Sequence, residues 1–200
     1  MSDAGRFAIS NELEREIVAA LTALPYAAYL EVVRRMLEAA GYENARLVRT
    51  GEERNAYGGV DIAATVLAGL LRRPVVAQAK KYTESVQKRY VDEIRGACLR
   101  SGASHGVIVS TSPFQSAARA AAAAVNIAPV RLVDGGEMAS ILARNRIGVV
   151  MRGGILHLDA PYFAGLARAA QKEQNRPAMP KCVNRRQSVT VTICLDAPTR

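Results

Sequence analysis

The segment Gly58–Lys81 constrains the fold more than any other part of the chain. It contains two apolar runs rich in valine and isoleucine, separated by a stretch with glycine and proline, which is the pattern of a β-hairpin. We expect one strand over Val60–Val66, a turn over residues 68–74 and a second strand over Val75–Lys81. A hairpin of this kind needs a larger domain to cover its apolar faces.

Three polar residues interrupt these apolar runs, namely Asp61, Gln78 and Lys80. Because side chains alternate along a strand, Gln78 and Lys80 share one face. A hairpin that turns near Leu70 pairs Asp61 with Ala79, so we expect the carboxylate beside the other two side chains. An acid, an amide and an ammonium on an apolar sheet are costly unless they pair or hold a metal ion. In a purely structural alternative Asp61 caps a turn, Gln78 bonds a neighbour and Lys80 extends to the surface.

Length and charge limit the class of protein. The 200 residues are half apolar and carry a formal net charge of +9, which suits one domain with extensions. Residues 46–100 carry 11 basic and 6 acidic side chains, and residues 151–200 carry 8 and 3. A polyanionic partner is the natural inference, with nucleic acid ahead of membrane. Since no apolar run approaches membrane-spanning length and no signal peptide opens the chain, we expect a soluble, cytoplasmic protein.

The remaining segments predict an α/β layered domain around the hairpin. Helices are expected at residues 11–24, 26–40, 86–100, 114–125 and 137–144, the third capped by Thr83 or Ser85, and strands at 45–50, 106–111 and 129–133. Alternating strands and helices after the hairpin imply parallel crossovers. Beyond about residue 150 the pattern weakens to a short helix at 162–170 and a strand candidate at 188–195. That strand could extend the sheet edge, pair with another subunit or stand alone.

Several familiar catalytic sites are excluded by the sequence. It has no GxxxxGK[ST] phosphate loop, HExxH or GxSxG motif, only two histidines, and three cysteines without a CxxC pair. A hard-cation site remains, because a carboxylate with a few oxygen partners suits Mg²⁺. Lys80 beside it could position or deprotonate a water, or stabilise charge on a phosphate. These are the parts of metal-assisted phosphodiester hydrolysis.

Over residues 26–150 a series of short segments follows in order: YLEVVRRMLEAAGY, GGVDI, VVAQAKKY, VDEIRGAC, GVIVSTSPF with QSAARAAA, then VRLVDGGEMASIL and IGV. Together they resemble the nuclease domain of Mrr-type restriction endonucleases, the QxK branch of the PD-(D/E)XK nuclease superfamily. The resemblance implies a restriction-endonuclease-like core, with a central mixed β-sheet flanked by helices. It also implies a Mg²⁺-dependent endonuclease, with Mn²⁺ as a substitute, that hydrolyses phosphodiester bonds of double-stranded DNA in restriction or defence.

The resemblance also implies roles for individual residues. Asp61 matches the motif aspartate and is a metal ligand, and Lys80 matches the motif lysine. Gln78 takes the second acidic position, and the carbonyl of Ala79 is a further ligand. Because a neutral amide oxygen holds Mg²⁺ less firmly than a carboxylate, Glu31 on the leading helix could supply the missing negative charge as the family's glutamate.

The resemblance also predicts the domain boundaries and the partners of the chain. The resemblance leaves a helical extension at 1–25 and a basic extension at 151–200, and too few preceding residues for the winged-helix DNA-reading domain of many Mrr-type proteins. Target selection is therefore expected from the C-terminal extension, a partner protein or a second subunit. Cutting both strands with one site per chain favours a homodimer. Two alternatives are an inactive DNA-binding or assembly module on a nuclease fold, and a junction or repair nuclease of the same superfamily.

Overall fold

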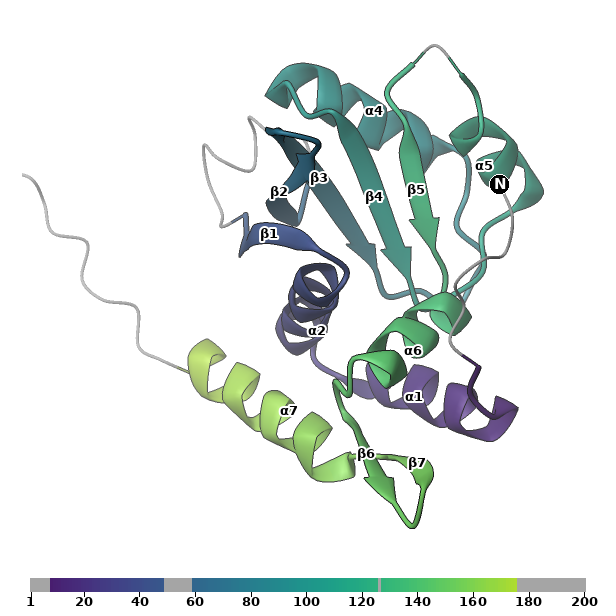
Figure 1. Cartoon of the computed structure of the whole chain (residues 1–200), viewed down its shortest axis with the longest axis vertical. Helices are drawn as coiled ribbons and strands as arrows, with labels where there is room; N and C mark the ends of the chain where they lie inside the picture. Colours follow the sequence, from purple (N-terminus) through teal and green to yellow (C-terminus); the bar gives the residue numbers. More distant parts are fainter. Residues whose placement is uncertain (1–7, 49–58, 126, 176–200) are drawn as a thin grey trace, which may run out of the picture.

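A mixed five-stranded sheet forms the centre of the protein in the computed structural model, which describes residues 8–48, 59–125 and 127–175 (Figure 1). The strands lie side by side in chain order: β1 (Tyr42–Leu47), β2 (Ile62–Ala68), β3 (Leu71–Lys80), β4 (His105–Ser110) and β5 (Val130–Val133). β1–β2 and β2–β3 are antiparallel, whereas β3–β4 and β4–β5 are parallel. The expected mixed sheet with parallel crossovers after the hairpin is confirmed.

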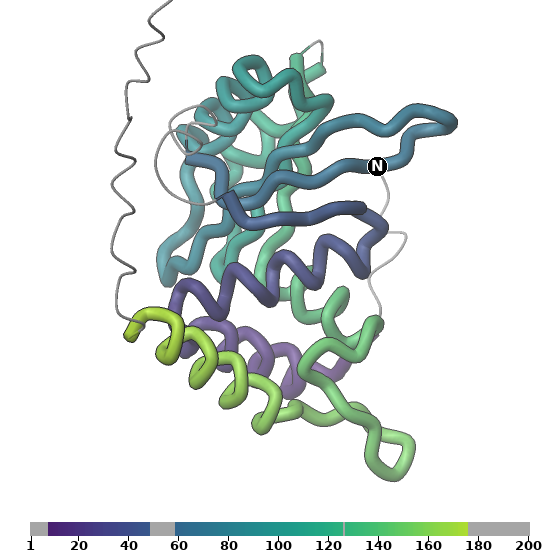
Figure 2. The backbone as a smooth tube through the Cα atoms, turned by 90° about the vertical axis from the view of Figure 1, so that its left-hand side faces the viewer, coloured from purple at the N-terminus to yellow at the C-terminus, as the bar shows by residue number. Residues whose placement is uncertain are grey.

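Helices cover both faces of this sheet and create two separate apolar cores (Figures 1 and 2). One core is shared by α1 (Asn11–Ala23), α2 (Tyr26–Ala39), α6 (Gly135–Arg144) and α7 (Ala160–Gln174). The other is shared by α4 (Arg89–Ser101) and α5 (Ser116–Ala122). Alternation along β3 sends Ala77 and Ala79 into the first core and Val76 into the second.

The β2–β3 hairpin is longer and its turn tighter than the sequence suggested. Ala68 pairs with Leu71, so the loop has two residues and Ile62 lies opposite Ala77, one residue away from the expected register. Gly69 opens the loop with φ of 64°, a backbone angle that glycine adopts readily in two-residue hairpin turns. Pro74 lies in β3 instead of the turn. It is tolerated there because β4 begins to pair with β3 only at Val75.

Two helices, α4 and α6, begin at residues other than those expected from the sequence. Val86 was expected to open a helix, but its N–H donates to Pro113 at 2.9 Å and its backbone forms a parallel bridge with Phe114. α4 therefore starts at Arg89, and its preceding residue makes no side-chain cap. The second helix, α6, was expected to begin at Glu137 but already includes Gly135 and Gly136. Asp134 caps it by accepting a hydrogen bond from the N–H of Glu137.

The segments flanking the matched region pack onto the same body. α1 buries Leu13, Ile17 and Leu21 in the core that it shares with α2, and α7 buries Phe163 there. α7 is longer than the expected helix at 162–170, and a hairpin of β6 (Val149–Arg152) and β7 (Ile155–Leu158), which the sequence did not suggest, precedes it. The candidate strand at 188–195 lies outside the described residues. None of the helices in the described ranges is long and apolar enough to cross a membrane.

Candidate metal centre

The last three residues of β3 and the residue before β2 bring the predicted polar groups together. Asp61 donates its N–H to the carbonyl of Ala77 at 3.0 Å. Its carboxylate turns toward the end of β3, where Oδ2 accepts the N–H of Ala79 at 2.9 Å. The residue is only 8% exposed. The structure thus places a buried carboxylate against the backbone of residue 79, close to Gln78 and Lys80 in the strand.

Gln78 contributes an amide whose two ends are in different situations. Its Nε2 donates to the carbonyl of Gly59 at 2.9 Å, which orients the side chain. Its Oε1 is buried and accepts no hydrogen bond from any residue that the structure describes. Gly59 has φ of 84°, and a β-carbon there would lie 3.4 Å from the Gln78 amide nitrogen. The backbone angle therefore favours glycine at position 59, whereas the contact of a β-carbon with Gln78 would be an ordinary one.

The two consecutive lysines at the end of β3 diverge. The ammonium of Lys81 donates to the carbonyl of Leu24 at 2.6 Å and ties β3 to the linker between α1 and α2. Lys80 lies on the opposite face, where its Nζ is 4.4 Å from the ring centroid of Tyr90 and 5.8 Å from that of Tyr82. Lys81 therefore has a structural role, and Lys80 is the lysine available for chemistry.

Two tyrosines of α2 hold the backbone that the sequence predicted to contribute a ligand. The hydroxyl of Tyr26 donates to the carbonyl of Ala79 at 3.1 Å, and that of Tyr29 donates to the carbonyl of Lys80 at 3.3 Å. Burial raises the pKa of Tyr29, which keeps its hydroxyl protonated as a donor. The apolar periodicity that predicts a helix at 26–40 does not reveal these two hydrogen bonds. For Tyr29 the missed signal is the choice of tyrosine over phenylalanine, because a buried hydroxyl needs a partner.

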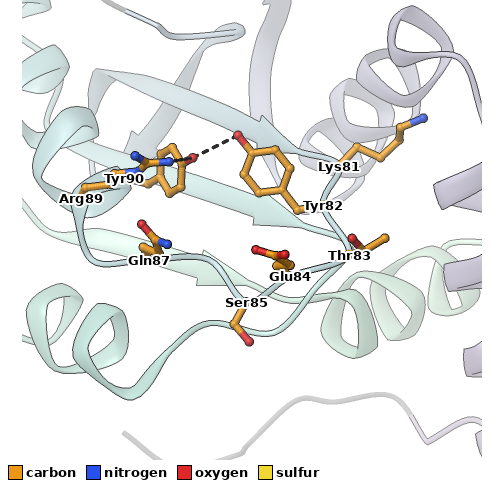
Figure 3. A pocket seen from close by; sticks show the side chains of 8 residues that line it. All are labelled: Lys81, Tyr82, Thr83, Glu84, Ser85, Gln87, Arg89 and Tyr90. Atoms are coloured by element: carbon orange, nitrogen blue, oxygen red, sulfur yellow. Dashed lines mark hydrogen bonds between the residues drawn. The ribbon is translucent and has the colours of Figure 1, made fainter.

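Two cavities open beside this strand end. A small one of about 230 Å³ is lined by Tyr26, Ala79, Lys80, Lys81 and Tyr82. A larger one of about 400 Å³ is lined by residues between Lys81 and Tyr90, whose side chains are shown in Figure 3. There the Tyr82 and Tyr90 hydroxyls point toward each other, while Lys81 points away from them. Ala79, Lys80 and Tyr82 line the smaller cavity, so a ligand can reach the strand end on that side.

Glu31 lies in a different environment. It follows the buried Tyr29 by two residues, about 200° around the helix, so its side chain leaves the face that contacts the sheet. Its carboxylate pairs with Arg34 and Arg35 at 2.8 Å each. Hydrogen bonding from Arg34, and then from Arg35, lowers the pKa of Glu31. Glu31 is held by these two arginines, and its role as a metal ligand stays a prediction.

The groups at the end of β3 fit a hard divalent cation. The carboxylate of Asp61, the buried Oε1 of Gln78 and the carbonyl of Ala79 are oxygen donors, which Mg²⁺ and Mn²⁺ prefer. The carbonyl of Ala79 has a second lone pair beside the one used by Tyr26. In the described part of the chain no group of three or more His, Cys, Asp or Glu residues gathers, so a zinc-type cluster is not formed there.

Comparisons with known proteins agree with the mixed α/β fold. The family model Mrr_cat, restriction endonuclease, matches residues 21–142. The fold resembles the DNA modification-dependent restriction endonuclease AspBHI, with a TM-score of 0.61, 16% identity and coverage of 84% of this chain and 43% of that one. It also resembles the MspJI restriction endonuclease, solved in complex with a 27-mer oligonucleotide, with a TM-score of 0.53, 22% identity and coverage of 86% and 38%. This chain thus spans about two fifths of these structures. Curated protein sequences gave no significant match.

Proposed function

This chain belongs to the Mrr-type restriction endonuclease family, and from that premise we propose that it hydrolyses phosphodiester bonds of double-stranded DNA with Mg²⁺ or Mn²⁺. The observation that carries the proposal is the buried Oε1 of Gln78, which has no partner among the described residues and lies on the same strand end as a buried carboxylate and a lysine. An unsatisfied buried acceptor is costly in a folded protein, and a bound cation would remove that cost.

Three oxygen donors would hold the cation: the carboxylate of Asp61, the amide oxygen of Gln78 and the carbonyl of Ala79. A cation bound by them would polarise a phosphoryl oxygen and make water a stronger nucleophile at neutral pH. Asp61 supplies the charge, and the N–H of Ala79 holds one of its oxygens in place at 2.9 Å. Tyr26 and Tyr29 orient the two carbonyls that follow Gln78.

Lys80 would act on the phosphate. Its ammonium offers three hydrogen-bond donors, which suit the oxygens of a phosphodiester and the negative charge that grows on them during hydrolysis. The lining of the larger cavity includes Lys81 and Arg89 beside Glu84, and Lys88 precedes Arg89 in the chain. These basic residues would contact the DNA backbone, so DNA affinity is expected to fall steeply as the salt concentration rises.

A homodimer is the simplest way for a protein with one such site per chain to cut both strands, and it is part of the proposal. The boundaries proposed for the nuclease domain are residues 26–150, with extensions at 1–25 and 151–200. One structural relative depends on DNA modification, so methylated DNA belongs among the substrates to compare.

A plasmid cleavage assay tests the proposal. Supercoiled plasmid, methylated and unmethylated, is incubated with the purified chain with and without Mg²⁺, and nicked and linear products are measured. Wild-type protein should cut only with the cation, and Asp61→Ala and Lys80→Ala should each abolish cutting. Lys172→Ala, an exposed change on α7, is the matched control and should cut normally. Unchanged cutting by both site variants would refute the site.

A second function, a DNA-binding or assembly module without activity, is favoured by one observation. Gln78 stands where most of the superfamily has an acid, so Asp61 is the one carboxylate among the three proposed ligands. Such a module would bind DNA in a salt-dependent manner that Mg²⁺ does not change. Comparing the binding of a DNA duplex with and without Mg²⁺, together with the plasmid assay, separates the two functions.

A further inference from the structure

The ammonium of Lys80 lies between two aromatic side chains. Its Nζ is 4.4 Å from the ring centroid of Tyr90 and 5.8 Å from that of Tyr82, both within the range of cation–π attraction. Tyr90 comes from the first turn of α4 and is 8% exposed, whereas Tyr82 follows the end of β3 and is 39% exposed. One buried ring and one half-exposed ring therefore hold the cation from two different elements.

These two rings are themselves fixed in place. Their hydroxyls lie 3.2 Å apart, and a guanidinium nitrogen of Arg89 donates to the hydroxyl of Tyr90 at 2.7 Å (Figure 3). The backbone of Tyr82 is held to the end of β4, because Thr111 Oγ1 donates to its carbonyl at 2.9 Å. The hydrogen bonds from Tyr82 and Arg89 lower the pKa of Tyr90. The tyrosine pair is thus a braced structure and not two independent side chains.

Aromatic rings hold a cation differently from a carboxylate. Within the described residues Lys80 is part of no ion pair. A lysine stem has four rotatable carbons and loses considerable freedom when it is fixed. The face of a tyrosine ring stabilises the ammonium by its quadrupole and leaves the full charge for another partner. Such an arrangement suits a cation that must attract a phosphate.

We propose that Tyr90 and Tyr82 are positioning residues that hold the Lys80 ammonium in place for the phosphate of the DNA substrate. This inference rests on the proposed nuclease function, in which Lys80 contacts the phosphate. Tyr90 carries most of the effect because its ring is closer and more buried than that of Tyr82. Arg89 acts one step further away, through the hydroxyl of Tyr90.

Kinetics of three variants test the inference. Tyr90→Leu removes the ring and should lower kcat for plasmid cleavage about tenfold while the KM for DNA stays unchanged, since the ring is only 8% exposed and acts through Lys80. Tyr90→Phe keeps the ring and should retain kcat within about twofold, and Tyr82→Leu should fall between the two. Thermal melts identify any variant that fails to fold. A kcat for folded Tyr90→Leu equal to wild type would overturn the inference.

A second measurement does not depend on cleavage. The ε-methylene protons of a lysine held over ring faces resonate upfield, so ¹³C-lysine spectra should show the Lys80 signal upfield of the Lys81 signal. The displacement should vanish in Tyr90→Leu and persist in Tyr90→Phe. Its absence from the wild type would overturn the aromatic positioning whatever the activity. Normal displacement in a wild type that cuts no DNA would refute the proposed function instead, and with it the phosphate role of Lys80.

Discussion

Two polar clusters lie on neighbouring elements of this protein, and they are built in opposite ways. At the end of β3, the buried oxygen of Gln78 lacks a partner among the described residues, and Lys80 is held by aromatic rings instead of an acid. On α2, the carboxylate of Glu31 is paired with Arg34 and Arg35 at 2.8 Å each. Arg34 also reaches Glu38 at 2.5 Å, and Arg35 donates to Tyr162 of α7 at 3.3 Å.

The difference shows how to separate a candidate site from a structural ion network. The α2 cluster pairs its charges internally and joins α2 to α7. The cluster at the end of β3 keeps a buried acceptor and a positive charge that the fold does not use, which costs stability. Buried polar groups without hydrogen-bond or charge partners are found most often at functional sites. The unsatisfied cluster is therefore the one expected to bind the cation and the phosphate.

The same chemical change made in each cluster should have very different effects on cation binding. Asp61→Asn removes the carboxylate from the three proposed ligands and should weaken Mn²⁺ binding by about 100-fold or more, because hard cations depend on ligand charge. Glu31→Gln should change the affinity less than about twofold, since its carboxylate is engaged by two arginines. Calorimetric titration of each protein with Mn²⁺ measures both.

This pair of variants can also overturn the comparison. Comparable losses in the two proteins would make Glu31 a ligand, as the resemblance implied. α2 would then have to turn its ion network toward the β3 end when the cation binds. Circular dichroism of each variant before titration provides the folding control.

A smaller effect is expected at the amide of Gln78. Gln78→Leu removes the oxygen donor and should weaken Mn²⁺ binding about tenfold. It also breaks the hydrogen bond to Gly59, but it removes a buried acceptor with no partner among the described residues. These effects oppose each other, so the free energy of unfolding should stay within about 1 kcal/mol of wild type. Titration and urea unfolding measure the two quantities.

The control for this variant is Gln87→Leu, an exposed change in the larger cavity that should alter neither quantity. Gln78→Leu with unchanged Mn²⁺ affinity would show that the amide oxygen is not a ligand. A loss of several kcal/mol in stability would show instead that the amide has a structural role, as in the α2 cluster.

The smallest effect is expected from Glu31→Gln on stability. Its partly exposed ion pairs should contribute about 1 kcal/mol to the free energy of unfolding at neutral pH. The folded-state pKa of Glu31 is lowered, so this contribution is present above its ordinary pKa of 4.5 and is lost as the pH falls below that value toward the folded-state pKa. Melting temperatures of the two proteins should therefore differ at pH 7 and converge in acid.

Thermal melts at a series of pH values check this prediction, with Glu12→Gln, an exposed change in the first turn of α1, as the control. A difference that grows on acidification would contradict the lowered pKa. If Glu31→Gln lost DNA cleavage without any change in melting temperature, Glu31 would be a catalytic residue and not a structural one.

Much of the fold could be predicted because it depends on local pattern. Alternation along VVAQAKK placed Gln78 and Lys80 on one face, and the strand and helix alternation after it predicted the parallel crossovers that the sheet shows. The register of the hairpin was wrong by one residue, because it depended on whether the loop consists of Gly69 and Leu70 alone or also includes Leu71. The start of α4 was wrong because Val86 found a backbone partner in Phe114, 28 residues away in sequence.

The sequence by itself determined which residue types meet at the end of the hairpin, because alternation and strand pairing depend on neighbours in the chain. It did not determine which of these polar groups find a hydrogen-bond or charge partner in the folded protein. Only the tertiary structure decided that Glu31 meets two arginines, that Tyr26 and Tyr29 hold carbonyls of β3, and that rings from two elements hold Lys80. Satisfaction of a buried polar group depends on distances between distant segments, and those distances exist only after the layers have packed.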